Sequence, residues 1–159
     1  MGRIATDLET KIWTTLEMVE DPELPISVTD LGMIDRVDVS EGRVRITMVP
    51  TYSACPAIDV MRQDIQTRVK TLPGVADVSV ELSFARPWTM DRMTGRGKER
   101  LKQHGMSVPR SSAGPVVCPF CGSTNTTIEN PFGPTLCRAI YYCADCKNPI
   151  ERFKAPRDD

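Results

Sequence analysis

Apolar residues follow two different periods along the first half of the chain. After a capping box that starts at Thr6, they recur at every third or fourth position and predict a helix over residues 7–19. Residues 34–39 and 43–48 instead place apolar side chains at every second position, with a Ser-Glu-Gly turn between the two stretches. That alternation predicts a β-hairpin with one buried and one exposed face.

A second helix and a third strand are expected to follow this hairpin. Pro56 suits the first turn of a helix, and apolar residues then recur at helical spacing as far as Leu72. Alternation over residues 75–84 predicts the third strand. The order helix, strand, strand, helix, strand predicts an α+β fold, a small two-layer domain with a three-stranded sheet and packed helices. Short helices are expected near residues 88–93 and 97–105.

The stretch "SVPRSSAGP" at residues 107–115 has the composition of a linker. We therefore expect an α+β domain over residues 1–106 and a separate module over residues 116–159. The length of 159 residues suits one small domain followed by a smaller module.

Four cysteines in the C-terminal module have the spacing of a metal site. Cys118 and Cys121 form one CxxC pair, and Cys143 and Cys146 form a second, with 21 residues between the two pairs. Two such pairs can supply the four thiolates of a tetrahedral Zn²⁺ site, so a C-terminal zinc ribbon is predicted. Strand-like stretches are expected between the pairs, at residues 126–128 and 139–142. A rubredoxin-like iron site or a cluster on the same four cysteines is the alternative. A module of this size has little core, so the metal should supply much of its stability.

Cys137 and His104, two further candidate ligands, are interpreted as ordinary residues. Cys137 lies six residues before the second pair and fits a small, partly buried loop residue, with a spare thiol as the alternative. His104, the only histidine of the chain, lies at the end of a Lys-rich and Gln-rich helix. It fits a surface residue near a helix C-terminus better than a metal ligand.

Cys55 lies apart from the other cysteines, next to Pro56 at the expected start of the second helix. The positive end of a helix dipole favours the thiolate form of a cysteine. Three interpretations stay open: a buried core residue, a nucleophile, or a ligand in an incomplete, exposed metal site. In the last case Asp21, Glu23 and Asp30 of the preceding loops could complete the surroundings of the sulfur. An open site of that kind suits handing on a metal or cluster.

The charge pattern argues against nucleic acid and membrane as partners. The formal net charge is −1, and the basic run between Arg92 and Lys102 is interrupted by Glu99, as on a solvated helix face. The first residues lack the apolar segment of a signal peptide, and no apolar run is long enough to span a bilayer. Cysteines spaced for metal binding point to a reducing compartment, so a cytoplasmic location is expected.

Three motifs carry a resemblance to a known family. They are "DPE" at residues 21–23, "DLG" at residues 30–32, and a T-x-x-x-C-P loop from Thr51 to Pro56. In these motifs, the chain resembles the small α+β domains of iron–sulfur cluster assembly and carrier factors. With the run "ARPWTMDRMTGRGKERLKQHGMSVP" from Ala85 to Pro109 and the C-terminal ribbon, nearly the whole chain is similar to the D subunits of bacterial phenylacetyl-CoA 1,2-epoxidase systems.

The resemblance implies a non-catalytic accessory role in aerobic phenylacetate breakdown. Members of that family are expected to assist iron–sulfur cluster assembly or delivery to the reductase component, with the reductase and oxygenase components as partners and a homodimer left open. Carried over by position, the resemblance makes Cys55 the ligand of iron or a transient cluster, and the four ribbon cysteines the Zn²⁺ ligands. The residues that would shape the Cys55 loop are Asp21, Glu23, Asp30 and Thr51.

Two other functions are kept beside this one. The chain could be a structural or regulatory subunit of the oxygenase complex, in which case Cys55 would be dispensable. It could also be an independent thiol enzyme, but no patterned base accompanies the cysteine, so this is the weakest hypothesis.

Overall fold

The computed structural model describes residues 6–51, 55–108 and 115–154. The chain divides into two compact units, which are described separately. The first comprises Met1–Pro50 and Pro56–Arg86, and the second comprises Thr51–Cys55 and Pro87–Asp159. Across the three described ranges, every helix is too short or too polar to cross a membrane.

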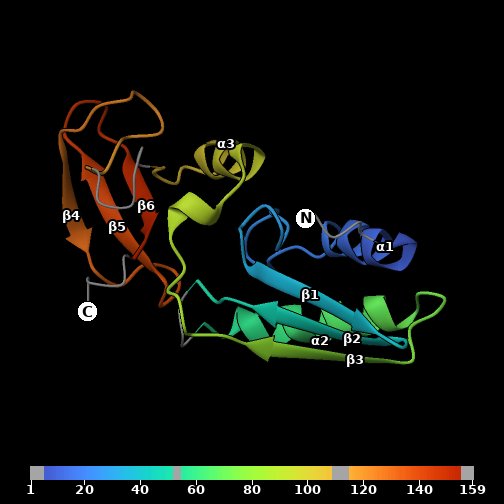
Figure 1. Cartoon of the computed structure of the whole chain (residues 1–159). Helices are drawn as coiled ribbons and strands as arrows, with labels where there is room; N and C mark the ends of the chain where they lie inside the picture. Colours follow the sequence, from blue (N-terminus) through green and yellow to red (C-terminus); the bar gives the residue numbers. More distant parts are fainter. Residues whose placement is uncertain (1–5, 52–54, 109–114, 155–159) are drawn as a thin grey trace. The chain divides into compact units, whose positions relative to one another are not determined.

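The first unit has the predicted order of elements. These are α1 (Asp7–Leu16), β1 (Ile34–Ser40), β2 (Arg43–Met48), α2 (Ala57–Lys70) and β3 (Asp77–Leu82) (Figure 1). Thr6 caps α1 as expected, since its hydroxyl accepts the backbone N–H of Glu9 at 3.2 Å. The helix ends three residues earlier than predicted, because the N–H groups of Met18 and Val19 bond to carbonyls only three residues back.

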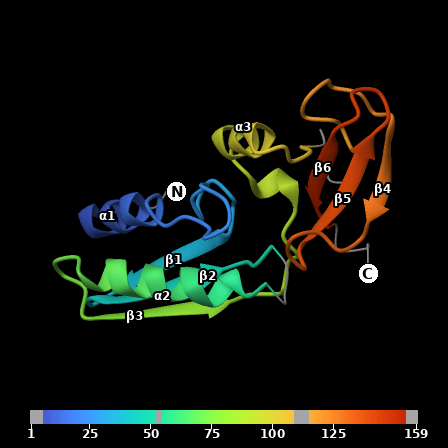
Figure 2. The same ribbon diagram turned by 180° about the vertical axis from the view of Figure 1, so that it is seen from behind.

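The three strands form one sheet in the order β1-β2-β3. β1 and β2 are antiparallel, with Val39 opposite Val44, which confirms the predicted hairpin. β2 and β3 are parallel, with Val44 opposite Val78. Parallel neighbours need a crossover connection, and α2 supplies it (Figure 2). The first unit is therefore an α+β fold, as the sequence predicts.

The core of the first unit lies between the sheet and the helices. Every second residue of β2 is buried on one face of the sheet. On the opposite face, Arg45 of β2 forms an exposed ion pair with Glu81 of β3, at 3.6 Å. The helices contribute apolar residues at helical spacing. The buried side chains are Val37, Val44, Ile46, Met48 and Val80 from the strands, and Ile12, Leu16, Met61, Ile65 and Val69 from the helices.

The second unit contains a short 3₁₀ helix, one α-helix and a second three-stranded sheet. Its elements are η1 (Met90–Arg92), α3 (Gly95–Gln103), β4 (Thr126–Asn130), β5 (Arg138–Cys143) and β6 (Pro149–Phe153). The strands lie in the order β4-β5-β6, and both pairs are antiparallel (Figure 1). The sequence predicts the first two strands and both helices, but it does not predict β6.

The segment that precedes the predicted linker packs with this second sheet. The ring of Trp88 meets Phe153 of β6 edge-on, with centroids 5.4 Å apart, and Met106 forms a parallel bridge with Glu151. Residues 87–108 therefore group with the ribbon, whereas the sequence places them in the domain over residues 1–106. Most of the expected linker, residues 109–114, lies outside the described residues. The domain boundaries thus stay a prediction.

Candidate metal centre and the Cys55 loop

The two cysteine pairs lie on matching turns. In the first, the N–H of Gly122 donates to the carbonyl of Cys118 at 2.9 Å, and in the second the N–H of Lys147 donates to the carbonyl of Cys143 at 3.0 Å. Gly122 and Lys147 both have a positive φ, of 75° and 64°. This conformation turns the chain sharply after the second cysteine, so that both sulfurs of a pair face the same side.

The four sulfurs come together at one point. Sγ of Cys118 lies 3.5 Å from Sγ of Cys146, and Sγ of Cys121 lies 3.7 Å from Sγ of Cys143. All four lie within 4.8 Å of one another. A tetrahedron of sulfurs about 2.3 Å from a zinc ion has edges of about 3.8 Å. The arrangement therefore fits one tetrahedral ion, whereas a cluster would need room for several iron atoms and sulfides between its thiolates.

The surroundings of Cys121 and Cys146 shift the pKa values of these two thiols in opposite directions. The Asn148 side chain, with Nδ2 at 3.4 Å from the sulfur, lowers the pKa of Cys146 to about 6. The backbone N–H of Ser123 lowers the pKa of Cys121, but desolvation and the neighbouring thiols outweigh it and raise that pKa to about 12. The thiol of Cys146 therefore ionises readily and can bind a cation, whereas Cys121 loses its proton only when a cation compensates the added charge.

A carboxylate joins the two turns beside the sulfurs. Asp145, between the cysteines of the second pair, accepts a hydrogen bond from the hydroxyl of Ser123 and one from Nδ2 of Asn125, the latter at 2.9 Å. These two bonds lower the pKa of Asp145. The backbone adds a third link, because the N–H of Ala144 donates to the carbonyl of Asn125 at 2.9 Å. These contacts of Asp145 with Ser123 and Asn125, called the Asp145 latch below, were not predicted from the sequence. Their only local signal is a small polar residue close to each cysteine pair.

The inner wall of the site is apolar. Cys118 and Cys143 are buried together with Ile150 of β6, and Tyr141 packs against them, whereas Cys121 is exposed. The unpredicted strand β6 thus supplies the side chain on which two of the four ligands rest. The site has one side sealed by the sheet and one side open to solvent.

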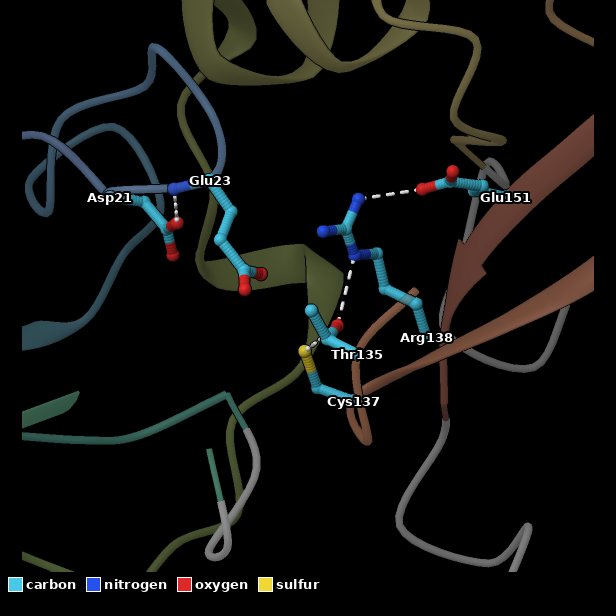
Figure 3. A network of polar contacts seen from close by, with 6 residues as sticks. All are labelled: Asp21, Glu23, Thr135, Cys137, Arg138 and Glu151. Atoms are coloured by element: carbon cyan, nitrogen blue, oxygen red, sulfur yellow. Dashed lines mark hydrogen bonds and ion pairs between the residues drawn. The ribbon is translucent and has the colours of Figure 1, made fainter. Parts of the chain in front are cut away.

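Cys137 lies outside the four-sulfur group, in a separate polar network (Figure 3). It is 5% exposed, and its sulfur lies 3.0 Å from the hydroxyl of Thr135. Nε of Arg138 donates to that hydroxyl at 3.1 Å, and its other end pairs with Glu151 at 2.6 Å. Cys137 is therefore a buried residue that directly precedes Arg138, the first residue of β5. His104 caps the C-terminus of α3 and is exposed, as the sequence predicts.

The loop between α1 and β1 contains the expected acidic residues. Asp21 accepts the backbone N–H of Glu23 at 2.8 Å, which closes a tight turn over the intervening proline (Figure 3). Further along, the hydroxyl of Ser27 accepts the N–H of Asp30 at 3.1 Å, and Asp30 is 4% exposed. Short side chains that bond their own backbone thus shape this loop.

Cys55 is half-buried and lies two residues before Ala57, the first residue of α2. Pro56 is the N-cap residue of that helix and makes no side-chain capping bond. Thr51 is also half-buried, and the residues between them, 52–54, lie outside the described part of the chain. Thr51 and Cys55 group with the second compact unit, whereas the acidic loop belongs to the first. Their assembly into one site stays a prediction.

Two family models match the chain, one on each side of residue 86. Residues 9–82 match the model described as "Iron-sulfur cluster assembly protein", and residues 102–154 match the "PaaD zinc beta ribbon domain". The C-terminal module is thus a zinc ribbon whose four cysteines could hold a metal ion.

Known proteins match either the first part or the whole of the chain. The "Fe-S protein maturation auxiliary factor YitW" of Bacillus subtilis is 35% identical over 59% of this chain and 93% of its own length. A solved structure, the "Domain of Unknown Function DUF59 from Bacillus anthracis", matches 59% of this chain and 91% of its own with a TM-score of 0.57 and 30% identity.

A longer match covers both modules. The D subunit of the "Putative 1,2-phenylacetyl-CoA epoxidase" of Escherichia coli is 38% identical over 97% of this chain and 97% of its own length. The similarity includes the assembly-type unit, the segment after it and the ribbon. The chain belongs to the family of this Escherichia coli protein, and its first part is related to iron–sulfur maturation factors.

Proposed function

We propose that the chain is a non-catalytic maturation factor of a phenylacetyl-CoA epoxidase system. It would assist iron–sulfur cluster assembly or delivery to the reductase component during aerobic phenylacetate breakdown. The observation that carries the proposal is that one chain contains both an iron–sulfur assembly unit and a zinc ribbon, and that it is similar to the Escherichia coli relative over 97% of its length. Relatives that match the first part alone carry the name of maturation factors.

Cys55 is the proposed ligand for the iron or cluster that is passed on. It is not fully buried, and it lies at the head of α2, where the helix dipole favours a thiolate. The cluster is cargo in this account, so it must leave again. A donor that supplies few ligands of its own suits transfer by ligand exchange, in which thiolates of the client replace the thiolate of Cys55 without a change of oxidation state.

The ribbon is proposed to hold Zn²⁺ permanently through Cys118, Cys121, Cys143 and Cys146. Four thiolates close the coordination sphere of a tetrahedral zinc ion and leave no position for a substrate, as in structural sites. The metal would then hold together two turns that share only a small apolar core. In this arrangement the ribbon is a folded surface for protein partners.

Metal and sulfide analysis after anaerobic reconstitution tests whether Cys55 binds iron or a cluster while the four ribbon cysteines bind zinc. Wild type should bind iron and sulfide in addition to one zinc per chain. Cys55→Ser should lose the iron and sulfide but keep the zinc, whereas Cys121→Ser, the matched change at the exposed ribbon ligand, should lose the zinc. Iron and sulfide that stay bound to Cys55→Ser would refute the proposed role of this cysteine.

A structural or regulatory subunit of the oxygenase complex is the second candidate, because the full-length relative carries the name of a subunit. The two candidates differ in whether Cys55 is needed. A strain with Cys55→Ser at the chromosomal locus should grow poorly on phenylacetate if the chain is a maturation factor. Normal growth, with a fully loaded reductase component, would favour the subunit.

A further inference from the structure

Within the second unit, no described strand pairs with the outer edge of β4. At the other end of the sheet, the edge of β6 is occupied: the N–H of Ser107 donates to the carbonyl of Glu151 at 2.8 Å, and the N–H of Glu151 donates to the carbonyl of Gly105 at 3.2 Å. β4 pairs only with β5 among the described strands, and four of its five residues are exposed. It contains neither lysine nor proline, which commonly protect such edges.

The backbone of Ile128 points out of this edge. The N–H of Ala144 donates to the carbonyl of Asn125, so Asn125 faces β5 through its backbone. Backbone direction alternates along an antiparallel strand, and the register Thr126–Cys143, Thr127–Tyr142, Ile128–Tyr141 continues from that pair without interruption. The N–H and carbonyl of Thr127 therefore face β5, and those of Ile128 face outward.

The side chain of Ile128 continues an apolar row across the sheet. Ile128 lies opposite Tyr141, and Tyr141 lies opposite Ile150, so the three side chains share one face. Ile150 is fully buried, Tyr141 is half-buried and Ile128 is 56% exposed. The row thus starts inside the ribbon core and ends at the open edge, where a further apolar residue on an added strand would extend it.

We propose that β4 pairs with β4 of a second copy of this chain. In an antiparallel pair with Ile128 at the two-fold axis, its outward N–H and carbonyl bond to those of the partner's Ile128. Thr127 then lies opposite Glu129 of the partner subunit, so the only charged residues of the strand do not face each other. The two sheets become one six-stranded sheet.

A second copy fits this edge better than an arbitrary client segment because the strand is complementary to itself. Both the outward backbone groups and the apolar row are symmetric about the same residue, as a two-fold interface requires. The irregularity between Ile128 and Asn130 limits the pairing to a few residues. The interface is therefore small, and a weak dimer with a micromolar or higher dissociation constant is expected.

Sedimentation velocity over a range of concentrations tests the pairing on the zinc-loaded full chain. Wild type should form dimers as the concentration rises, and Ile128→Lys should weaken them by about tenfold or more, because it places two cations together at the axis. Val60→Lys, at a residue of α2 that is 54% exposed, is the control and should leave association unchanged. A wild type that stays monomeric at millimolar concentration, or an unchanged dimer in Ile128→Lys, would overturn the proposal.

Hydrogen exchange provides a readout that needs no substitution. The amide of Ile128 should exchange more slowly as the concentration rises, whereas the exchange of the Thr127 amide, already bonded to β5, should change much less. Ile128→Pro gives a second check, since it removes the outward N–H together with the isoleucine side chain, whereas the backbone groups of Thr127 that face β5 are unchanged. Concentration-independent exchange at Ile128 would contradict the pairing even if some other dimer forms. None of these results depends on the proposed function.

Discussion

Replacing Ile150 by alanine should destabilise the folded ribbon and so weaken its affinity for zinc. Ile150 is fully buried and packs with Cys118 and Cys143, two of the four sulfur ligands. The change removes three carbons, which is about 2.4 kcal/mol of burial at about 0.8 kcal/mol per carbon. The cavity left behind raises the cost to about 3–4 kcal/mol, within the range usual for this substitution.

This cost should be observed as lost zinc affinity. Folding of so small a module is coupled to metal binding, so destabilising the folded ribbon weakens the apparent affinity for zinc. At about 1.4 kcal/mol per factor of ten, a cost of 3–4 kcal/mol corresponds to roughly a 100-fold to 1,000-fold weaker affinity. Equilibrium competition between the purified chain and a chromogenic chelator measures this directly.

Ile128→Ala is the matched control for this experiment. Ile128 has the same side chain and lies in the same cross-strand row, but it is 56% exposed. At a dilution where the chain is monomeric, its zinc affinity should stay within about threefold of wild type, as for an ordinary surface change. If Ile150→Ala retained wild-type affinity, or if both variants lost the same amount, the apolar row would not be what supports the ligands.

Three further predictions concern the same module. Asp145→Asn should release zinc to a chelator severalfold faster than wild type, because the amide keeps one acceptor oxygen but turns its N–H₂ group toward the other of the two donors, Ser123 and Asn125, that now bond to the carboxylate. Gly133→Ala should lower the unfolding temperature of the zinc-loaded chain, since its Cβ would lie 2.7 Å from the carbonyl oxygen of Arg138, and a clash of this kind costs about 1–3 kcal/mol. Zinc affinity should fall as the pH is lowered from about 8 to about 6, because zinc must displace the proton of Cys121, whose pKa is raised to about 12. Cys146, with a pKa of about 6, is already deprotonated at pH 8 and becomes a second site of proton competition near pH 6. Titrations that show a pH-independent affinity would contradict the proton competition.

The first unit could be predicted from the sequence because its signals are local. Apolar period, the Thr6 capping box and the turn after Ser40 each fix one element, and all five helices and strands of the unit appear in the predicted order. The cysteine pairs at residues 118–121 and 143–146 were equally predictable, because the spacing alone brings two sulfurs to one side of a turn.

The missed features depend on residues far apart in the chain. β6 begins with a proline and carries only two buried apolar residues, and it becomes a strand because β5 pairs with it. The position of residues 87–108 beside the ribbon follows from the contact of Trp88 with Phe153, 65 residues later. Asp145 bonds to Ser123 across 22 residues, so the latch exists only once the two turns meet. Local pattern carries no information about such partners.

Transfer to the reductase component tests the central claim most directly. Reconstituted wild-type chain is mixed anaerobically with the cluster-free reductase component, and the cluster bound to the reductase is followed by its absorbance and by its restored electron transfer. The wild type should load the reductase, and Cys55→Ser with its full content of zinc should not. Equal loading by the two proteins would contradict the proposal that Cys55 carries the cargo.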